Sequence, residues 1–524
     1  MLNYKKLETI PVIDLFAGPG GLGEGFSSVV NNSNNRVFDI KLSIEMDSAA
    51  HETLLFRSFF RQFDTGRAPV EYYEVLKELN REIQHNKKTE LFKKYPAQHT
   101  EAKNEAWRCE LGHNDFPAGE VDRRIKSALG GKKSWVLIGG PPCQAFSMAG
   151  RSRVGGINKK DHRVYLYREY LRIIAVHQPT VFVMENVSGL LSAKLNGDSI
   201  FQMILNDLGD PGKIFTGTGS KLYRIYSFVK KPNNSLVEEN PKYDSFKDYL
   251  IKAENYGIPQ MRHRVILFGI REDKNEFHPP VLNESNKQIN LDDVIGNLPG
   301  IRSGVSRRII ETSIKNGRKR HIYEKIKDSA EVWMDTINRF REELGLETKK
   351  QNYYSERGAL YTECQQNLKV KTLHDWFIDP FLNGICNHES RNHLESDLKR
   401  YLFASDYLKR RNSFPRMKDY PEDLLPEHRS ATSGKFTDRF RVQPPDRPAT
   451  TITSHISKDG HYFIHYDPDQ CRSLTVREAA RIQTFPDNYY FWGTRTQQYH
   501  QVGNAVPPIL ARQLAEIVYK IIKK

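Results

Sequence analysis

The chain has 524 residues, enough to bury one or two full hydrophobic cores, so we expect two or three domains. Its 79 Lys and Arg residues outnumber its 64 Asp and Glu residues, and the formal charge of +15 favours polyanionic partners such as nucleic acid. The five cysteines are widely spaced and include no CxxC pair, which argues against a disulfide framework or a zinc ribbon and fits reduced thiols in the cytoplasm. The sequence contains no apolar run of about 18 residues, so no membrane span is predicted.

Three short apolar runs each stop at a chemically distinctive turn. Ile10–Leu15 precedes a group of glycines, Trp135–Ile138 precedes Pro141-Pro142-Cys143, and Val181–Met184 precedes Glu185-Asn186. A helix-like stretch follows each run, and this alternation predicts βα units in a parallel sheet with helices on both faces. Ligands of such sheets bind beyond the carboxyl ends of the strands, so we expect the three turns to line one cleft.

Changes in periodicity divide the rest of the chain. We predict a first domain over residues 1–283, in which a polar, helix-compatible stretch near residues 64–114 is an insertion. A second domain, with weaker periodicity and several basic clusters, is expected over residues 284–495. Residues 496–524 are expected to return to the first domain, because the apolar side chains between Ile509 and Ile521 fall on one face of a helix.

The glycines after the first apolar run have the spacing of a nucleotide-cofactor loop. Gly18, Gly20 and Gly23 form GxGxxG, and Glu45 follows at about the distance of an acidic residue that binds a ribose. A nicotinamide enzyme and a methyltransferase would both place glycines here, and a plain tight turn has the same pattern. The choice among these alternatives therefore depends on other segments.

Cys143 and Glu185 are the candidate reactive side chains. A lone cysteine is usually an inert core residue, but Cys143 follows two prolines at the end of a strand, in the expected cofactor cleft, where an activated thiolate is useful. Glu185 ends the next strand, where a carboxylate is either a surface or capping residue or a positioned acid.

Six segments in a characteristic order extend this pattern. They are DLFAGPGG at 14–21, GGPPCQAFS at 139–147, ENV at 185–187, YGIPQMRHR at 256–264, RPATTIT at 447–453 and QVGNAVPP at 501–508. Together they resemble the motifs of the cytosine-C5 DNA methyltransferases of bacterial restriction-modification type, and they bracket nearly the whole chain. The resemblance implies an α/β fold: a Rossmann-like S-adenosylmethionine-dependent methyltransferase domain with a smaller, mixed target-recognition domain at residues 284–495.

The resemblance also implies roles by position. Cys143 is the expected nucleophile, Glu185 contacts N3 of the cytosine, and Arg262 and Arg264 hold the base and the anions of the active site. The residues expected to bind S-adenosylmethionine are Phe16, which stacks on the adenine, Glu45, which binds the ribose hydroxyls, and Gly18, Gly20 and Asn504. No metal is expected.

These roles suit the methylation of a carbon that is not itself nucleophilic. Addition of the Cys143 thiolate to C6 of cytosine makes C5 an enamine-like carbon that can accept a methyl group, and a proton shared at N3 eases the addition. Because C5 and C6 are inaccessible in a stacked duplex, the base must be flipped out of double-stranded DNA.

Two positions depart from the family pattern. The acidic residue that binds the adenine is not evident soon after Glu45, and we assign it to Asp115, which places the insertion before it. Val164 stands where the family usually has asparagine, after the loop of Cys143, so closure of this loop over the flipped base could differ.

The segment between the QxRxR and RPxTxT motifs is expected to read the DNA sequence. Basic residues there would neutralise phosphates while others contact base edges in the major groove. Cys386, His388 and His393 lie in this segment, but their spacing matches no standard zinc site, and structural roles are expected.

Three other functions fit the sequence less well. A tRNA cytosine-C5 methyltransferase usually has a short target segment with a Cys-Phe-Thr signature, which is absent here, and a non-catalytic DNA-binding regulator typically loses the nucleophile or the glutamate. A dehydrogenase leaves Cys143, Glu185 and the segment from Gln260 to Arg264 unexplained. We therefore expect a monomeric enzyme that modifies host DNA, with a restriction endonuclease as its functional partner.

Overall fold

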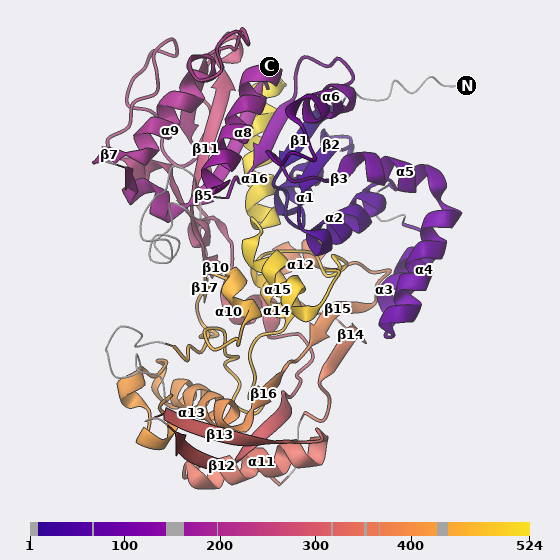
Figure 1. Cartoon of the computed structure of the whole chain (residues 1–524), viewed down its shortest axis with the longest axis vertical. Helices are drawn as coiled ribbons and strands as arrows, with labels where there is room; N and C mark the ends of the chain where they lie inside the picture. Colours follow the sequence, from indigo (N-terminus) through magenta and orange to yellow (C-terminus); the bar gives the residue numbers. More distant parts are fainter. Residues whose placement is uncertain are drawn as a thin grey trace.

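A computed structural model describes residues 9–64, 68–142, 162–195, 197–315, 318–350, 354–365, 367–426 and 439–523, without the side chains of residues 162–165, 315, 318 and 319. Figure 1 shows an upper lobe built around one large sheet, a middle layer of short helices, and a lower lobe with a long two-stranded ribbon. Within the described ranges, no helix combines the length and the apolar character that crossing a membrane requires.

The large sheet has the strand order β3-β2-β1-β4-β5-β11-β8, and β9 also pairs with β11. Strands β1 to β5 are parallel, whereas β11 is antiparallel to β5, β8 and β9. Their bounds are Ile10–Leu15 (β1), Phe38–Glu45 (β2), Ala106–Arg108 (β3), Val136–Gly139 (β4), Val181–Val187 (β5), Tyr223–Ser227 (β8), Leu250–Lys252 (β9) and His263–Arg271 (β11). The central strands are nearly continuous apolar runs, because helices cover both faces of the sheet.

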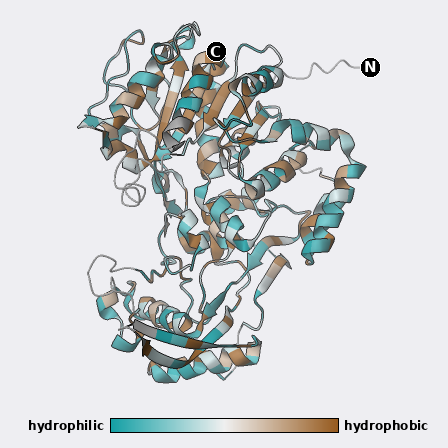
Figure 2. Ribbon diagram, in the orientation of Figure 1, coloured by the Kyte–Doolittle hydropathy of each residue, from teal (hydrophilic) through white to brown (hydrophobic). Residues whose placement is uncertain are grey.

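Helices from opposite ends of the chain cover the two faces. One face packs against α6 (Ala118–Leu129), α8 (His162–His177) and α9 (Ile200–Gly209). The other packs against α1 (Gly21–Ser27) and α16 (Pro508–Ile522), the long C-terminal helix that is yellow in Figure 1. Figure 2 shows the result: hydrophobic strands in the upper lobe and hydrophilic outer surfaces on its helices.

The stretch expected as an insertion contains three helices. After α2 (Ser48–Arg61), α3 (Val70–Lys77), α4 (Arg81–Lys94) and α5 (Pro96–Glu105) precede strand β3, so the sheet resumes at Ala106. Their aromatic core, in which Phe56 stacks on Tyr72 at 4.7 Å between ring centroids, also includes Tyr490 and Trp492 from the other end of the chain. The three helices therefore brace the upper lobe against the middle layer.

The middle layer shares one hydrophobic core. It consists of α10 (Leu291–Ile295), α12 (His374–Phe377), α14 (Val476–Ile482) and α15 (Arg495–Asn504). A short parallel pair, β10 (Gln260–Met261) with β17 (Ala449–Thr450), and an antiparallel pair, β14 (Gly358–Glu363) with β15 (Gly384–Glu389), adjoin it.

The lower lobe has a separate core. Strands β12 (Gly304–Lys315), β13 (Arg318–Lys325) and β16 (Asn392–Leu394) form a sheet of order β13-β12-β16 beside α11 (Ala330–Glu343) and α13 (Glu395–Arg411). A small hairpin of β6 (Lys194–Leu195) and β7 (Asp198–Ser199) completes the described strands of the chain. The upper lobe and the lower lobe thus meet through the middle layer.

Candidate active site and methyl-donor cleft

The turn after β1 forms one wall of the expected donor site. Gly18 and Gly20 have φ angles of +58° and +95°, which favour glycine. A Cβ on Gly20 would lie 2.8 Å from Cδ1 of Leu54 and 3.0 Å from the hydroxyl of Tyr489, so a side chain does not fit. A Cβ on Gly18 would meet no heavy atom within 4 Å. Backbone is therefore presented to open space at Gly18, as close approach of a ligand requires.

Glu45 closes this turn from the end of β2. Its Oε2 accepts a hydrogen bond from the backbone N–H of Gly18 at 2.8 Å, and its Oε1 accepts one from the N–H of Asp47 at 2.7 Å. Burial raises the pKa of the Glu45 carboxyl above its ordinary value, against the lowering effect of these two hydrogen bonds. A carboxylate retains further lone pairs, so Glu45 can hold the loop and still accept a hydrogen bond from a ribose hydroxyl.

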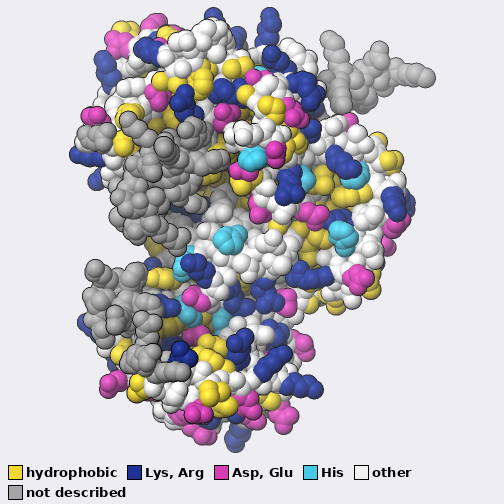
Figure 3. Space-filling model, viewed as in Figure 1, with side chains coloured by type: hydrophobic (Ala, Val, Ile, Leu, Met, Phe, Trp, Pro, Cys, Tyr) yellow, Lys and Arg dark blue, Asp and Glu magenta, His cyan; other side chains and the backbone are white. Residues whose placement is uncertain are grey.

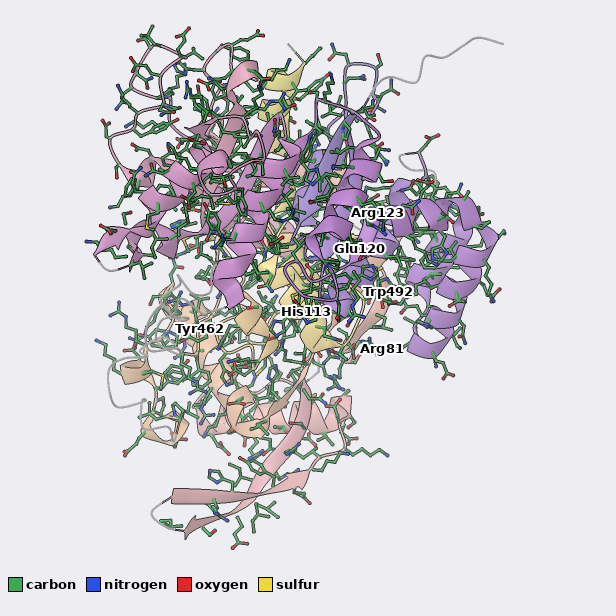
Figure 4. The ribbon with its side chains drawn as sticks, turned by 45° about the horizontal axis from the view of Figure 1, so that its top comes forward. Arg81, His113, Glu120, Arg123, Tyr462 and Trp492 are labelled. Carbon is green, nitrogen blue, oxygen red and sulfur yellow. The ribbon has the colours of Figure 1, made fainter. Side chains whose placement is uncertain are left out.

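Three other predicted donor-site residues lie in this turn or on two other segments. Phe16 is half-buried in the turn, and Asp115 lies exposed in the loop that leads from β3 to α6. Figure 4 labels His113 of that loop, whose Nδ1 accepts a hydrogen bond from the N–H of Asp115 at 3.2 Å. Asn504 is exposed at the end of α15, and the next segment packs closely on the start of α1. The turn itself thus offers an aromatic ring and a fixed carboxylate beside bare backbone, whereas Asp115 and Asn504 are exposed on separate segments.

The most direct contact among the predicted active-site residues joins Glu185 and Arg264. Nε of Arg264 lies 2.8 Å from Oε1 of Glu185, and both side chains are largely buried. Glu185 belongs to β5 and Arg264 to β11, whose antiparallel register places Arg264 opposite Val187. The pair is therefore fixed by two neighbouring strands.

Gly140 links this pair to the segment of the expected nucleophile. Gly139 is in register with Met184, so Gly140 follows β4 beside Glu185 at the carboxyl edge of the sheet. A Cβ on Gly140 would lie 2.9 Å from Oε2 of Glu185. Cys143 itself lies outside the described residues, three positions further along the chain.

Arg262 occupies a different environment from Arg264. Only 2% of its surface is exposed, and its guanidinium donates hydrogen bonds to the carbonyl oxygens of Ile452 at 2.8 Å and of Gly503 at 3.4 Å. Burial, together with the nearby charge of Arg264, lowers its pKa well below the ordinary value. Arg262 thus connects the RPATTIT and QVGNAVPP segments through their backbones, whereas Arg264 faces the Glu185 carboxylate.

A buried amide network, which the sequence did not reveal, surrounds this connection. Nε2 of Gln260 donates to the carbonyl oxygen of Ile482 at 3.1 Å and to Oε1 of Gln483 at 2.7 Å, and Oε1 of Gln260 accepts from the N–H of Ile452 at 2.9 Å. Gln483 in turn donates to the carbonyl oxygen of Val502 at 2.6 Å. The sequence signal that could have indicated this network was Gln260 itself, the first residue of the QxRxR motif.

A hollow of about 510 Å³ opens beside the same motif. It is lined by Met261, Arg441, Thr450, Thr451, Thr453, His455, Tyr462 and Phe463. The hydroxyl of Thr451 donates to the carbonyl oxygen of Met261 at 2.6 Å, and Figure 4 labels Tyr462 on this side of the molecule. The hollow combines hydroxyl, aromatic and cationic groups, which suits a nucleotide strand.

The candidate zinc residues of the middle and lower parts have other partners. Nδ1 of His388 lies 3.0 Å from the hydroxyl of Thr475, and its Nε2 lies 2.9 Å from the carbonyl oxygen of Pro299. Burial lowers the pKa of His388 to about 4. In the part of the chain that the structure describes, no three His, Cys, Asp or Glu side chains gather closely enough to hold a metal ion.

A mostly parallel sheet with a glycine turn, an acidic residue after its second strand and helices on both faces defines an α/β fold of the Rossmann-like methyltransferase class. The chain belongs to the C-5 cytosine-specific DNA methylase family, whose family model matches residues 97–217 and 229–520. It is a DNA (cytosine-5-)-methyltransferase.

Relatives in bacteria and archaea agree with this assignment. The chain is 32% identical to the type II methyltransferase M.Bpa9945I of Bacillus paralicheniformis over 98% of this chain and 99% of that protein. It is 27% identical to the type II methyltransferase M1.HphI of Haemophilus parahaemolyticus over 79% of this chain and 78% of that protein. It is 26% identical to the DNA (cytosine-5-)-methyltransferase M.ApeKI of Aeropyrum pernix over 79% of this chain and 87% of that protein.

Proposed function

We propose that the enzyme methylates C5 of a flipped cytosine within a specific short sequence of double-stranded DNA, through a covalent bond between Cys143 and C6. The observation that carries this proposal is the ion pair of Glu185 and Arg264 beside Gly140, at the strand end from which the chain leads to Cys143. The pair sits where a positioned acid and a cation are needed by the reaction.

Each of the four proposed active-site residues has a separate role in the reaction. The Cys143 thiolate forms a bond to C6, and Glu185 holds a proton at N3, which drains electron density from the ring during the addition. Arg264 orients the Glu185 carboxylate, and Arg262 holds the surrounding segments in place. After methylation, the proton on C5 passes to solvent, the bond between C6 and the Cys143 sulfur breaks with its electron pair on sulfur, and the aromatic ring is restored.

S-adenosylmethionine, when bound, supplies an electrophilic methyl group, and the cleft after β1 suits it. We propose that Phe16 stacks on the adenine, Glu45 accepts hydrogen bonds from the ribose, and Asn504 contributes a polar contact. Gly18 and Gly20 keep the backbone free of side chains. The open space at Gly18 and the fixed carboxylate of Glu45 support this assignment. Asp115 is the proposed partner of the adenine amino group.

We propose that the enzyme is the modification component of a restriction system and works as a monomer. Support comes from the relatives in Bacillus and Haemophilus, which are both described as type II methyltransferases. Residues 284–495 are the proposed target-recognition domain, and a restriction endonuclease that cuts the same sequence is the proposed functional partner.

Bisulfite sequencing of plasmid DNA from cells that express the chain tests the reaction. Wild type is expected to protect one short motif from conversion, and Cys143→Ser is expected to protect none. Cys364→Ser is the matched control, because Cys364 is a half-buried thiol whose pKa is raised to about 11 by burial, and it should protect like wild type. Absence of any protected motif with wild type would refute the DNA assignment and redirect the search to RNA.

A ligand test addresses the methyl donor separately. A ligand that binds only the native state raises the melting temperature by mass action. S-adenosylmethionine is expected to raise it and NAD is not, and the opposite result would favour a dehydrogenase.

A further inference from the structure

Strands β12 and β13 form an exposed ribbon at the end of the lower lobe, defined here as residues 304–325. Figure 1 shows the ribbon at the far end of the molecule from the large sheet. From Arg307 to Ile314, and from Ile322 to Lys325, every described side chain on both strands is exposed. At about 3.3 Å per residue the ribbon is about 36 Å long, close to one turn of B-form DNA.

The base of the ribbon is firmly attached. Arg302 binds both carboxylate oxygens of Asp328, at 2.9 and 3.1 Å, and Asp328 also accepts a hydrogen bond from the N–H of Val305 at 3.0 Å. From Gly304 to Arg307, β12 pairs with β16, and its register with β13 begins at Arg307. The ribbon therefore has a fixed direction, although its outer part lacks a third strand among the described residues.

The strand register sorts the side chains onto two faces. Cross-strand partners share a face, which pairs Arg307 with Lys325, Ile309 with Tyr323 and Thr312 with His321. Two contacts agree with this: the Thr312 hydroxyl lies 2.8 Å from Nδ1 of His321, and the rings of His321 and Tyr323 are 6.0 Å apart. We call these six residues the basic face.

The opposite face carries the acidic residues of the ribbon. It includes Glu311 and Glu324, and Nε of Arg308 lies 3.5 Å from Oε2 of Glu324. Among the described side chains the basic face has no Asp or Glu. Its positive charge is therefore not neutralised within the ribbon, whereas that of the other face is partly compensated.

The ribbon also exposes an unusual amount of apolar surface. Ile309, Ile310, Ile314, Ile322 and Tyr323 are 41%, 58%, 75%, 50% and 42% exposed. A two-stranded ribbon with exposed isoleucines is marginally stable and prone to association unless it meets a partner. Charged residues on the edge strand β13 disfavour pairing with a second ribbon, so a polyanion fits better than another copy of the chain.

We propose that the basic face binds double-stranded DNA that flanks the methylated site, with Arg307 and Lys325 on phosphates and Ile309 and Tyr323 in the groove. The major groove accepts a two-stranded ribbon, and apolar side chains can contact thymine methyl groups there. Figure 3 shows Lys and Arg side chains spread over the visible face of the lower lobe, with Asp and Glu side chains between them, so cations are available there for an extended DNA contact. The inference rests on the proposed function, because it takes DNA as the substrate.

The test compares DNA affinity at several salt concentrations for wild type and the double variant Arg307→Ala/Lys325→Ala. Each phosphate contact contributes about 0.9 to the slope of log affinity against log salt, so the slope should fall by about 2. At 0.1 M salt this corresponds to about 50-fold weaker binding on a duplex of about 40 base pairs. On a duplex of about 14 base pairs centred on the methylated site, the two proteins should bind alike.

The matched control is Lys132→Ala/Lys133→Ala, which removes two exposed charges before β4, at the amino edge of the large sheet. The control should keep the wild-type slope, and all three proteins should keep the same melting temperature. An unchanged slope in the ribbon variant on the long duplex, or an equal loss in the control, would overturn the proposal.

Sedimentation separates DNA binding from self-association. If Ile309→Ser/Tyr323→Ser converted a dimer to a monomer without weakening DNA binding, the ribbon would be a surface for a second copy and the proposal would be wrong. Binding is measured without methylation, so the two proposals fail separately. A wild-type chain that methylates no motif refutes the proposed function alone, and an unchanged salt slope refutes the ribbon alone.

Discussion

Replacement of Gln260 by leucine tests the amide network that holds the active-site segments together. Gln260 is fully buried, and its amide joins Ile452, Ile482 and Gln483. Leucine has a similar volume but leaves three polar groups without these hydrogen bonds. A buried unsatisfied group costs about 1–3 kcal/mol, so the loss of three such bonds should lower the free energy of local opening by about 3–9 kcal/mol.

Hydrogen exchange followed by mass spectrometry measures this local opening. Since about 1.4 kcal/mol corresponds to a factor of ten, amides in the peptide around Ile452 should exchange about 10²-fold to 10⁶-fold faster in Gln260→Leu. Methyl transfer should fall as well, because Arg262 donates to the carbonyl oxygen of Ile452. Met261→Leu is the control: it changes the neighbouring residue of β10, which is 38% exposed. Exchange within threefold of wild type in both variants would refute the reasoning.

Three further predictions concern buried charge and the donor cleft. Glu45→Gln should weaken S-adenosylmethionine binding by about tenfold to a hundredfold in calorimetry, because an amide nitrogen cannot accept the hydrogen bond of a backbone N–H or a ribose hydroxyl; unchanged affinity would contradict the assignment. Burial raises the pKa of Asp14 to about 8, above its unfolded value of about 4, so wild-type stability should fall as pH rises between these values by up to about 1.4 kcal/mol per unit. Asp14→Asn should lose this pH dependence, so its denaturation midpoint relative to that of wild type should rise from pH 5.5 to pH 7.5. A difference between the two midpoints that stays the same at both pH values would contradict this prediction. Arg481→Ala should cost about 3–5 kcal/mol in denaturant unfolding, because it leaves fully buried Asp487 without its 2.6 Å ion pair, and a loss below about 1 kcal/mol would show that Arg477 suffices.

The large sheet and its reactive edge were predictable because their signals are local. Apolar runs that end at glycines, at Pro141-Pro142 or at Glu185 specify strands and their final turns within a few residues. In a parallel sheet these turns must meet at the carboxyl edge, so the neighbourhood of Gly140 and Glu185 followed from the pattern. The α/β fold and the family were therefore evident before any tertiary contact was known.

The different environments of the two motif arginines could not be predicted. Arg262 and Arg264 are two residues apart, and both were expected to hold the base and active-site anions. Arg264 meets a carboxylate from the neighbouring strand, whereas Arg262 meets backbone carbonyls of Ile452 and Gly503. The contacts of Arg262 join positions about 190 and 240 residues apart in sequence, and no local pattern records which acceptor a buried guanidinium will find.

The sequence by itself determined the order of the motifs, the strands that present them and the chemistry that they share, because each depends on residue type and short-range spacing. Tertiary structure alone decided that helices α3 to α5 brace the upper lobe against Tyr490 and Trp492, and that Gln260 joins three segments. It also decided that β12 and β13 pair in a register that collects Arg307, His321 and Lys325 on one face. The physical reason is that packing and strand register depend on contacts between distant residues, where a shift of one position moves every side chain to the other face.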